Sequence, residues 1–246
     1  RQESLTTAVA LNKCASLLAV GDFEGVVKFW AADDQGRFAV TENAISFKGP
    51  ITCLTFEPDG PLLAIAANND ALKVVDTSKH VDPPLTIKVN SGRRTLWRFG
   101  THQKWSKWIR GVFAADFSPS GKQIAVGCTD NRAIVYDSDS GEQRQSMTIE
   151  VDSFWGTGIL SVAYNRGGNE LALGGRDGRI TICDTNTGTI LHEMRSDDLA
   201  IRSLTYDNTG QYLFSGSASG AVRFWHVDTA SESSPLIATD DQVIKV

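Results

Sequence analysis

Five copies of one spacing pattern run along this 246-residue chain, and they constrain its fold more than any other feature. In each copy an apolar anchor residue precedes a short turn. A second apolar residue follows the anchor by 7 positions, a glycine or alanine by 10, and a further apolar residue by 19. The anchors are Leu11, Phe56, Phe117, Tyr164 and Tyr206, and the residues 19 positions later are Trp30, Val75, Tyr136, Cys183 and Trp225. A recurring spacing of this length indicates a repeated unit of supersecondary structure.

The apolar segments within each copy are short and bounded by turn residues, as in 121–128 and 132–137, which predicts strands. We find no stretch with the period of an amphipathic helix, so we expect an all-β chain. A fourth short segment follows in each copy, and four-stranded units at this repeat length are typical of β-propeller blades. We expect the small residue at the tenth position to let neighbouring sheets approach closely.

Four segments resemble the WD40 repeat, namely EGVVKFWA (24–31), DNRAIVYD (130–137), DGRITICD (177–184) and SGAVRFWH (219–226), and NDALKVVD (69–76) is a weaker fifth copy. The resemblance implies a WD40-type β-propeller with five four-stranded antiparallel blades in a single domain. The expected blades are approximately 1–45, 46–106, 107–153, 154–195 and 196–246. No copy has the Gly-His pair of the family, which implies that the family's buried hydrogen-bond tetrad is absent and that apolar packing holds the blades together.

The number of blades leaves two interpretations open, because propellers with about 4–8 blades occur. We expect the five blades to be part of a larger, seven-bladed ring, and the alternative is a closed ring of five. The chain begins at Arg1 and not at a methionine, so we also expect it to be part of a longer protein.

The connection before the third unit, residues 79–110, breaks the regular spacing. It carries eight Lys and Arg residues against the single acid Asp82, a net charge of +7 in a chain of formal net charge −5, so the rest of the chain carries −12. It also holds three of the six tryptophans. Exposed Trp and Arg side chains are typical of binding hot spots, so we predict a partner-binding patch in this basic insert. The predicted residues are Arg93, Arg94, Trp97, Arg98, Phe99, Trp105, Lys107 and Trp108.

Two other interpretations of the insert stay open. In the first, its tryptophans only anchor a long connection, and the basic side chains are solvated around them. In the second, guanidinium groups beside aromatic rings bind an anion such as RNA or a phosphoinositide. The pair Arg93-Arg94 is similar to the Arg pair of phosphoinositide-binding propellers, but Gly92 precedes the pair here, whereas in that family a glycine follows it.

Patterns of catalytic or metal-binding residues are missing from the sequence. His80, His102, His192 and His226 lie in different units, and we find no nucleophile elbow and no phosphate-binding loop. We therefore expect no enzymatic activity, no cofactor and no metal. The predicted function is a scaffold or adaptor that binds protein partners, acidic ones among them, through loops on the propeller faces, as part of a multi-protein complex. The net charge of −5 disfavours a general nucleic-acid-binding surface.

The cysteines and the apolar runs bear on the cellular compartment. The four cysteines lie far apart in the sequence, which favours a reduced protein over a disulfide scaffold. The longest apolar run, Leu62 to Ala67, is far shorter than the roughly 20 residues of a membrane-spanning helix. We expect an intracellular, cytoplasmic protein, with the nucleus as the alternative compartment.

Overall fold

The structure is a computed structural model of residues 1–246, and it describes residues 4–68, 71–79, 84–89, 95–96, 108–109, 111–150, 158–195, 199–232 and 237–238. Every regular element in these segments is a strand, and most strands belong to five antiparallel sheets, which confirms the all-β prediction. Within the described residues we find no helix with the length and apolar character needed to cross a membrane.

The five sheets follow the chain order, and we number them 1 to 5. Sheet 1 consists of β1 (Thr6–Leu11), β2 (Leu17–Asp22), β3 (Val26–Ala32) and β4 (Phe38–Ser46). Sheet 2 consists of β5 (Ile51–Phe56), β6 (Leu62–Ala67), β7 (Ala71–Asp76) and β8 (Leu85–Lys88). Sheet 3 consists of β11 (Val112–Phe117), β12 (Gln123–Cys128), β13 (Arg132–Asp137) and β14 (Gln143–Thr148).

Sheet 4 consists of β15 (Ile159–Tyr164), β16 (Glu170–Gly175), β17 (Arg179–Asp184) and β18 (Ile190–Arg195). Sheet 5 begins with β19 (Ile201–Tyr206), β20 (Tyr212–Ser217) and β21 (Ala221–His226). Two short strands, β22 (Ser231–Glu232) and β23 (Ile237–Ala238), share the fourth place of sheet 5, because both pair with β21.

The repeat positions of the sequence occupy equivalent places in the five sheets. In sheet 3 the anchor Phe117 pairs with Ile124, and Ile124 pairs in turn with Tyr136. The corresponding anchor, seventh and nineteenth residues lie side by side across three strands in each of the other sheets. The pairing of the first strand with the second also has an irregularity at the same point in every sheet. In sheet 3 the register shifts between Val112 and Ala114, and Ala114 lies three positions before the anchor Phe117; the other four sheets show the same offset. The constant spacing in the sequence therefore corresponds to a constant pairing register across the first three strands of each sheet.

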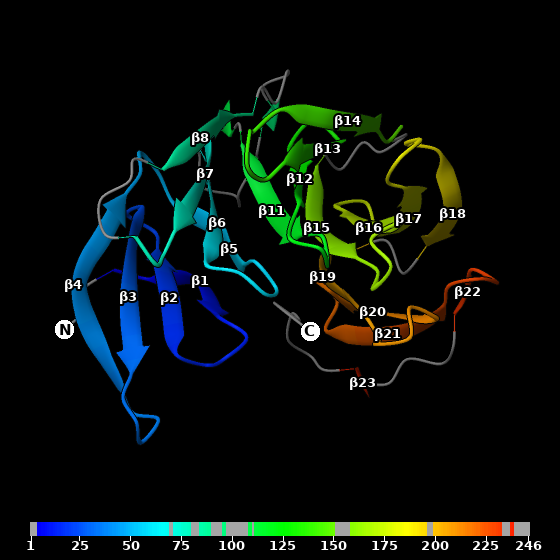
Figure 1. Ribbon diagram of the computed structural model, residues 1–246. Coiled ribbons are helices and arrows are strands. Elements are labelled where there is room, and N and C mark those ends of the chain that lie inside the picture. Colours follow the sequence, from blue (N-terminus) through cyan, green and yellow to red (C-terminus); the bar gives the residue numbers. More distant parts are fainter. Residues whose placement is uncertain are drawn as a thin grey trace.

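The sheets follow one another around an arc, from the blue sheet 1 to the orange sheet 5 (Figure 1), as blades of a β-propeller do. The inner strands β1, β5, β11, β15 and β19 are neighbours in this order. Four apolar clusters join consecutive sheets; in one of them Met147 of sheet 3 packs with Leu171 of sheet 4. The prediction of propeller blades is confirmed. The five described sheets form an open arc and do not close into a ring of their own.

The small residue at the tenth position lies where one sheet meets the next, as the sequence predicts. A β-carbon on Gly127 would stand 2.7 Å from Cγ2 of Ile159, and one on Gly21 would stand 2.5 Å from Cγ2 of Ile51. Sheet 2 has the larger Ala66 at this position, and the next sheet presents Val112, which is smaller than isoleucine. The larger residue of sheet 2 is thus combined with a smaller residue of sheet 3 in one apolar cluster.

Apolar clusters join the sheets as expected, and hydrogen bonds between the sheets supplement this packing. The Thr52 hydroxyl donates to the Val112 carbonyl at 2.6 Å, and the Tyr164 amide donates to Asp116 Oδ2 at 2.9 Å. Within sheet 5 the buried Trp225 Nε1 donates to Ser215 Oγ at 2.8 Å. The bonds of Thr52 and Asp116 join side-chain oxygens of inner strands to backbone groups of the adjacent sheet.

Candidate partner-binding face

The described strand ends that lead from one sheet to the next lie on one face of the arc. In sheet 3 the first residue of β11 pairs with the last residue of β12, and the first residue of β13 pairs with the last residue of β14. The chain therefore enters and leaves the sheet at the end that also carries the β12–β13 turn. The same register holds in the other sheets, and we call this side the connection face. The opposite side, which carries the β11–β12 and β13–β14 turns, is the hairpin face.

Two consecutive turns on the connection face carry the same ion pair. In the β12–β13 turn Arg132 Nε lies 2.8 Å from Asp130 Oδ2, and in the β16–β17 turn Arg179 Nε lies 3.3 Å from Asp177 Oδ2. The other carboxylate oxygen accepts the backbone amide of the same arginine, at 3.3 Å and 3.2 Å. The aspartates are almost buried and the arginines are about one quarter exposed, so the turns present guanidinium groups to solvent.

A crevice lies between sheets 3 and 4 on the connection face. Its apolar side chains are Ile149 from the end of sheet 3, Ile159 at the start of β15, and Leu173 of β16. Its polar side chains are Asn131, Arg176, Asp177, Arg179 and Thr181. We call this hollow the sheet 3–4 crevice.

Asn131 fixes the relation between the two walls of the crevice. Its backbone has a φ of 65°, a left-handed conformation that asparagine tolerates better than most residues. Its Oδ1 accepts the backbone amide of Gly158, which leads into sheet 4, and its carbonyl accepts the amide of Ile149 at 2.9 Å. One turn residue therefore connects the last residues of sheet 3 to the first residues of sheet 4.

Arginine side chains concentrate around this crevice. Burial lowers the pKa of Arg176, and the positive charge of Arg202 on sheet 5 lowers it further. Arg195 stands directly opposite Arg179 in the β17–β18 ladder. Arg179 Nη1 also donates to the Glu150 carbonyl at 3.5 Å.

Segment 89–111, which holds most of the basic insert, leaves from the connection face. Lys88, the last residue of β8, pairs with the first residue of β7, and Val112, the first residue of β11, pairs with the last residue of β12. The sequence predicts a long loop over 90–108, but the structure shows two short strands in it, β9 (Thr95–Leu96) and β10 (Trp108–Ile109), which pair antiparallel. Threonine, tryptophan and isoleucine favour strands, which accounts for this ribbon.

Most of the predicted partner-binding residues lie outside the described residues. Trp108 is the exception, and the structure describes only its backbone, as a residue of β10 opposite Leu96. The patch as a whole therefore stays a prediction. The others are Arg93, Arg94, Trp97, Arg98, Phe99, Trp105 and Lys107.

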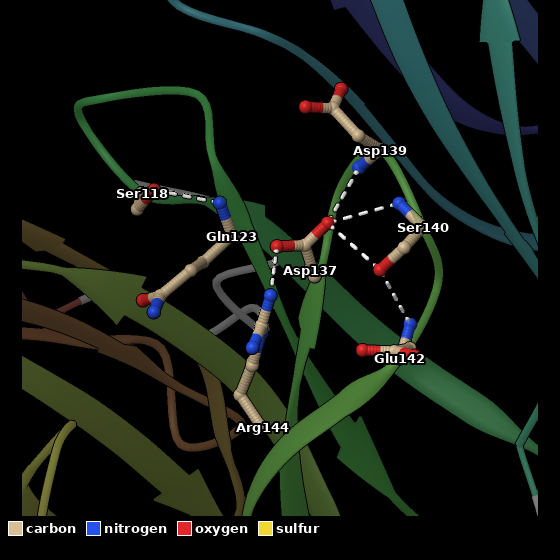
Figure 2. Close-up of polar contacts among 7 residues, drawn as sticks. All are labelled: Ser118, Gln123, Asp137, Asp139, Ser140, Glu142 and Arg144. Atoms are coloured by element: carbon tan, nitrogen blue, oxygen red, sulfur yellow. Dashed lines mark hydrogen bonds and ion pairs between the residues drawn. The ribbon is translucent and has the colours of Figure 1, made fainter.

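The hairpin face carries a second recurrent feature, in which an aspartate organises a turn. Figure 2 shows the turn after β13, where Asp137 Oδ1 accepts the backbone amides of Asp139 at 3.1 Å and Ser140 at 2.9 Å. Arg144 Nη2 donates to Asp137 Oδ2 at 2.7 Å. The Ser140 amide, followed by Arg144, holds the Asp137 pKa far below its usual value. On the next sheet, Asp184 accepts the backbone amides of Asn186 and Thr187 in the turn after β17. These carboxylates therefore stabilise the turns through hydrogen bonds.

Metal-binding chemistry has no candidate in the described part of the chain, where no three His, Cys, Asp or Glu side chains form a group that could hold a metal ion. Cys183, at the nineteenth position of its repeat, is fully buried, and burial raises its pKa to about 11. Cys183 is therefore a packed thiol of the core between sheets 3 and 4.

Sequence reasoning missed the sheet 3–4 crevice. The recurring Asp-x-Arg of residues 130–132 and 177–179 was a usable signal, because it places an arginine at the same turn position of two consecutive units. The effect of the Arg202 charge on Arg176 had no such signal, since these residues come from different sheets and are 26 positions apart.

A family model described as "WD domain, G-beta repeat" matches three segments of the chain, residues 42–76, 94–137 and 188–226. The first segment covers β5 to β7, the second runs from the insert through β13, and the third runs from β18 through β21. All three end at the third strand of a sheet, so each match has the phase of the repeat seen in the structure. A search of curated proteins gives no match.

Proposed function

The chain belongs to the WD40-repeat family, and on this premise we propose that it is a non-catalytic scaffold that binds protein partners through its connection face. WD40 repeats generally mediate protein–protein interaction. Family membership does not determine what this chain binds, so the choice of face has to come from its own residues.

One observation supports the choice of face: the sheet residues that flank segment 89–111 lie on the same side of the arc as the arginine-bearing turns. Lys88 before this segment and Val112 after it both pair at the connection-face end of their sheets. Arg132 and Arg179 mark the next two turns on that face. Segment 89–111 carries six Lys and Arg residues and no acid in a chain of net charge −5, so this face would attract an acidic partner and orient it during association.

The rigidity of the fold supports the same proposal. Each sheet packs on the next through an apolar cluster, so loops on the connection face have fixed origins. A binding surface that is already in place costs little conformational entropy on association. Recognition would then depend on surface shape and charge, with no chemical step.

The test is an affinity capture from native lysate, quantified by mass spectrometry, with the wild-type chain and an Arg93→Ala/Arg94→Ala/Arg98→Ala variant. We expect the variant to lose the specific partners of the wild type, because these guanidinium groups are predicted contacts. Identical partner profiles for the two proteins would refute the proposal for the insert.

A matched control removes three positive charges from the hairpin face. Lys13, Lys122 and Arg166 lie in the turns between the first and second strands of sheets 1, 3 and 4, and all three are exposed. The triple alanine variant of these residues should retain the partners. Loss of partners in both variants would indicate an effect of net charge alone and would contradict a specific face.

The alternative function, anion binding by the same insert, predicts a different result. RNA or phosphoinositide binding would weaken steeply with salt, because it releases counterions. A titration of the wild-type chain with a single-stranded RNA oligonucleotide and with inositide-containing vesicles, at low and moderate salt, distinguishes the two functions.

A further inference from the structure

We propose that the two ends of the arc bind each other between copies of this chain, so that sheet 5 of one copy packs on sheet 1 of the next. The occupant of each end face is therefore a second copy of the chain. The contact leaves the connection face free, so the inference goes beyond the proposed function and does not rest on it.

Each of sheets 2 to 5 turns the same row of residues toward the sheet before it. In sheet 3 this row is Phe117, Ile124 and Tyr136, and all three belong to an apolar cluster with residues of sheet 2. The corresponding rows of sheets 2, 4 and 5 lie in clusters with sheets 1, 3 and 4. We call the side of a sheet that carries this row its leading face and the opposite side its trailing face. Four contacts in the molecule thus join a trailing face to a leading face.

The leading face of sheet 1 has the same apolar row at one end of the arc (Figure 1), and no apolar cluster of the described residues covers it. The row is Leu11, Leu18 and Trp30, side by side on three strands. Leu11 is 50% exposed, whereas the equivalent Phe117 is 3% exposed. An exposed apolar patch of this kind marks an interaction surface. The exposed apolar side chains that extend it are Val9, Phe38 and Val40.

Sheet 5 ends the arc with an apolar trailing face. Phe214 lies opposite Phe224 on this face, and their ring centroids are 5.3 Å apart. Tyr212 stacks on Phe224 with ring centroids 4.8 Å apart. Thr205 of the inner strand β19 lies opposite Phe214 and is exposed, whereas the equivalent Ala163 of sheet 4 is buried against sheet 5. The trailing face of sheet 5 is therefore accessible to a partner at its inner strand.

The sizes of the residues on the two end faces complement each other. In sheets 1 to 4 the eighth position after the anchor is an alanine on the trailing face, and the aromatic anchor of the next sheet lies in the same apolar cluster. Sheet 5 has Phe214 in place of this alanine, and sheet 1 has Leu11 in place of an aromatic anchor. The larger residue of sheet 5 would thus meet the smaller anchor of sheet 1. The four alanines are Ala19, Ala64, Ala125 and Ala172.

The close approach at the tenth position can also be repeated between copies. Gly21, Gly127 and Gly174 each lie against the isoleucine that begins the next sheet, five positions before its anchor. Sheet 5 has Gly216 at the tenth position, and sheet 1 has the exposed Thr6 five positions before its anchor. Threonine is β-branched, with the shape of the valine that begins sheet 3. The same pair of small and β-branched residues is therefore present at the two ends of the arc.

The one lysine of this row of strands is compatible with such a contact. Lys28 lies on the leading face of sheet 1, opposite Val20. Lys73 holds the equivalent position of sheet 2, inside an existing contact between sheets, and donates to the Ser46 carbonyl of sheet 1 at 3.3 Å. Its Nζ also lies 4.2 Å from the centre of the Phe47 ring. A lysine at this position can therefore bury its stem between two sheets and keep a partner for its charge.

A contact between unlike faces has a direction, because each copy uses sheet 5 on one side and sheet 1 on the other. Such a contact produces a closed ring or an open chain of copies, according to the rotation between neighbours. In either case, a copy that has lost one end face can still join one other copy through its remaining face.

Sedimentation velocity of the wild-type chain and two charge variants tests the proposal. Leu11→Arg places a charge on the leading face of sheet 1, and Thr205→Arg places one on the trailing face of sheet 5. Both positions are exposed, so the fold should tolerate the arginine. We expect the wild-type chain to associate as its concentration rises and each variant alone to keep the mass of one chain, because a buried unpaired charge opposes the contact. The control Asn208→Arg adds the same charge to an exposed hairpin-face turn and should associate as the wild type does.

A mixture of the two variants distinguishes contact between unlike faces from a two-fold contact between like faces. Leu11→Arg retains its sheet 5 face and Thr205→Arg retains its sheet 1 face. An equal mixture should therefore form pairs of one copy of each variant and nothing larger. A further variant, Phe214→Ala, gives sheet 5 the alanine of the other four sheets. It should weaken association of the chain about tenfold, through the loss of an aromatic contact.

Three results would overturn the proposal. In the first, the wild-type chain keeps the mass of one chain at every concentration, so that the end faces have a different occupant or none. In the second, the wild type associates but the mixture of variants does not, as expected for contact between like faces. In the third, either variant alone associates as the wild type does, which would place the contact elsewhere. Partner capture at the connection face is measured separately, so the proposed function can stand or fail independently of these results.

Discussion

Gly127 lies so close to Ile159 that a β-carbon on the glycine would stand 2.7 Å from Cγ2 of the isoleucine. The contact joins sheets 3 and 4, and Gly174 meets Ile201 at the same distance between sheets 4 and 5. A glycine at this position is needed for space and not for an unusual backbone conformation. This makes the contact a sensitive probe of sheet-to-sheet packing.

Gly127→Ala should therefore destabilise the protein by about 1–3 kcal/mol, the usual cost of overpacking a buried contact. Ile159→Val should recover at least half of this loss in the double variant, because it recreates the combination of Ala66 and Val112 between sheets 2 and 3. The double-mutant cycle, measured by urea unfolding, should show a favourable coupling of about 0.5–3 kcal/mol. Additive effects of the two substitutions would contradict the predicted contact.

The open arc gives two equivalent leucines unequal surroundings. Leu171 and Leu18 both hold the seventh position of their repeats, but Leu171 is fully buried against sheet 3, whereas Leu18 on sheet 1 is only half-buried. Leu171→Ala should cost about 2–5 kcal/mol, and Leu18→Ala should cost less than about 1.5 kcal/mol. Equal losses in chemical unfolding would show that the exposed side of sheet 1 is covered in solution.

The sequence predicts the sheets well because strand length and hairpin turns are both fixed within a unit. Two tight turns bring three residues of one unit side by side on adjacent strands, namely Phe117, Ile124 and Tyr136. The same offsets place the equivalent residues side by side in each of the other copies. The close approach at Gly127 follows from the same repeat.

The crevice could not be predicted in this way, because it depends on how separate sheets meet. Arg176 directly follows β16, a position that looks like any other turn residue in the sequence. The effect of the Arg202 charge on its pKa depends on how sheets 4 and 5 pack, which the sequence does not indicate. The Asn131 bond to Gly158 likewise joins residues of different units. Contacts within a repeat are encoded by spacing, whereas contacts between repeats depend on the angle between sheets.

Acid should destabilise the protein through its turn aspartates. The Thr187 amide, followed by the Thr187 hydroxyl, lowers the pKa of Asp184, and the Ser140 amide, followed by Arg144, lowers that of Asp137. A carboxyl whose pKa is lower in the folded than in the unfolded state stabilises the fold fully above the unfolded value of about 4. That contribution is lost as the pH falls through the folded value.

The urea midpoint should accordingly fall between pH 6 and pH 3. An Asp137→Asn/Asp184→Asn variant should start from a lower midpoint at pH 6 and show a smaller further fall. The control is Asp139→Asn, since the Asp139 side chain points away from the Asp137 turn in Figure 2. A pH dependence equal to that of the wild type in the double variant would contradict the role assigned to these turns.

The four thiols should differ sharply in reactivity. Cys14 is exposed, and hydrogen bonds from Ser16 lower its pKa, whereas burial raises the pKa of Cys183 to about 11. Because the thiolate is the reacting species, a disulfide reagent at pH 8 should modify Cys14 first and Cys183 only after unfolding. Peptide mapping after brief labelling measures this order, and Cys14→Ser should remove the fast phase. Early labelling of Cys183 would show that sheet 4 opens readily.

The most direct measurement of the central claim, that partners bind the connection face, is photo-crosslinking from both faces. A benzophenone amino acid replaces Glu24 or Leu199 on the connection face, and Lys13 or Asn208 on the hairpin face; all four residues are exposed. The account predicts that the same partner proteins are crosslinked from positions 24 and 199 and not from 13 and 208. Equal crosslinking from both faces, or crosslinking confined to the hairpin face, would contradict it.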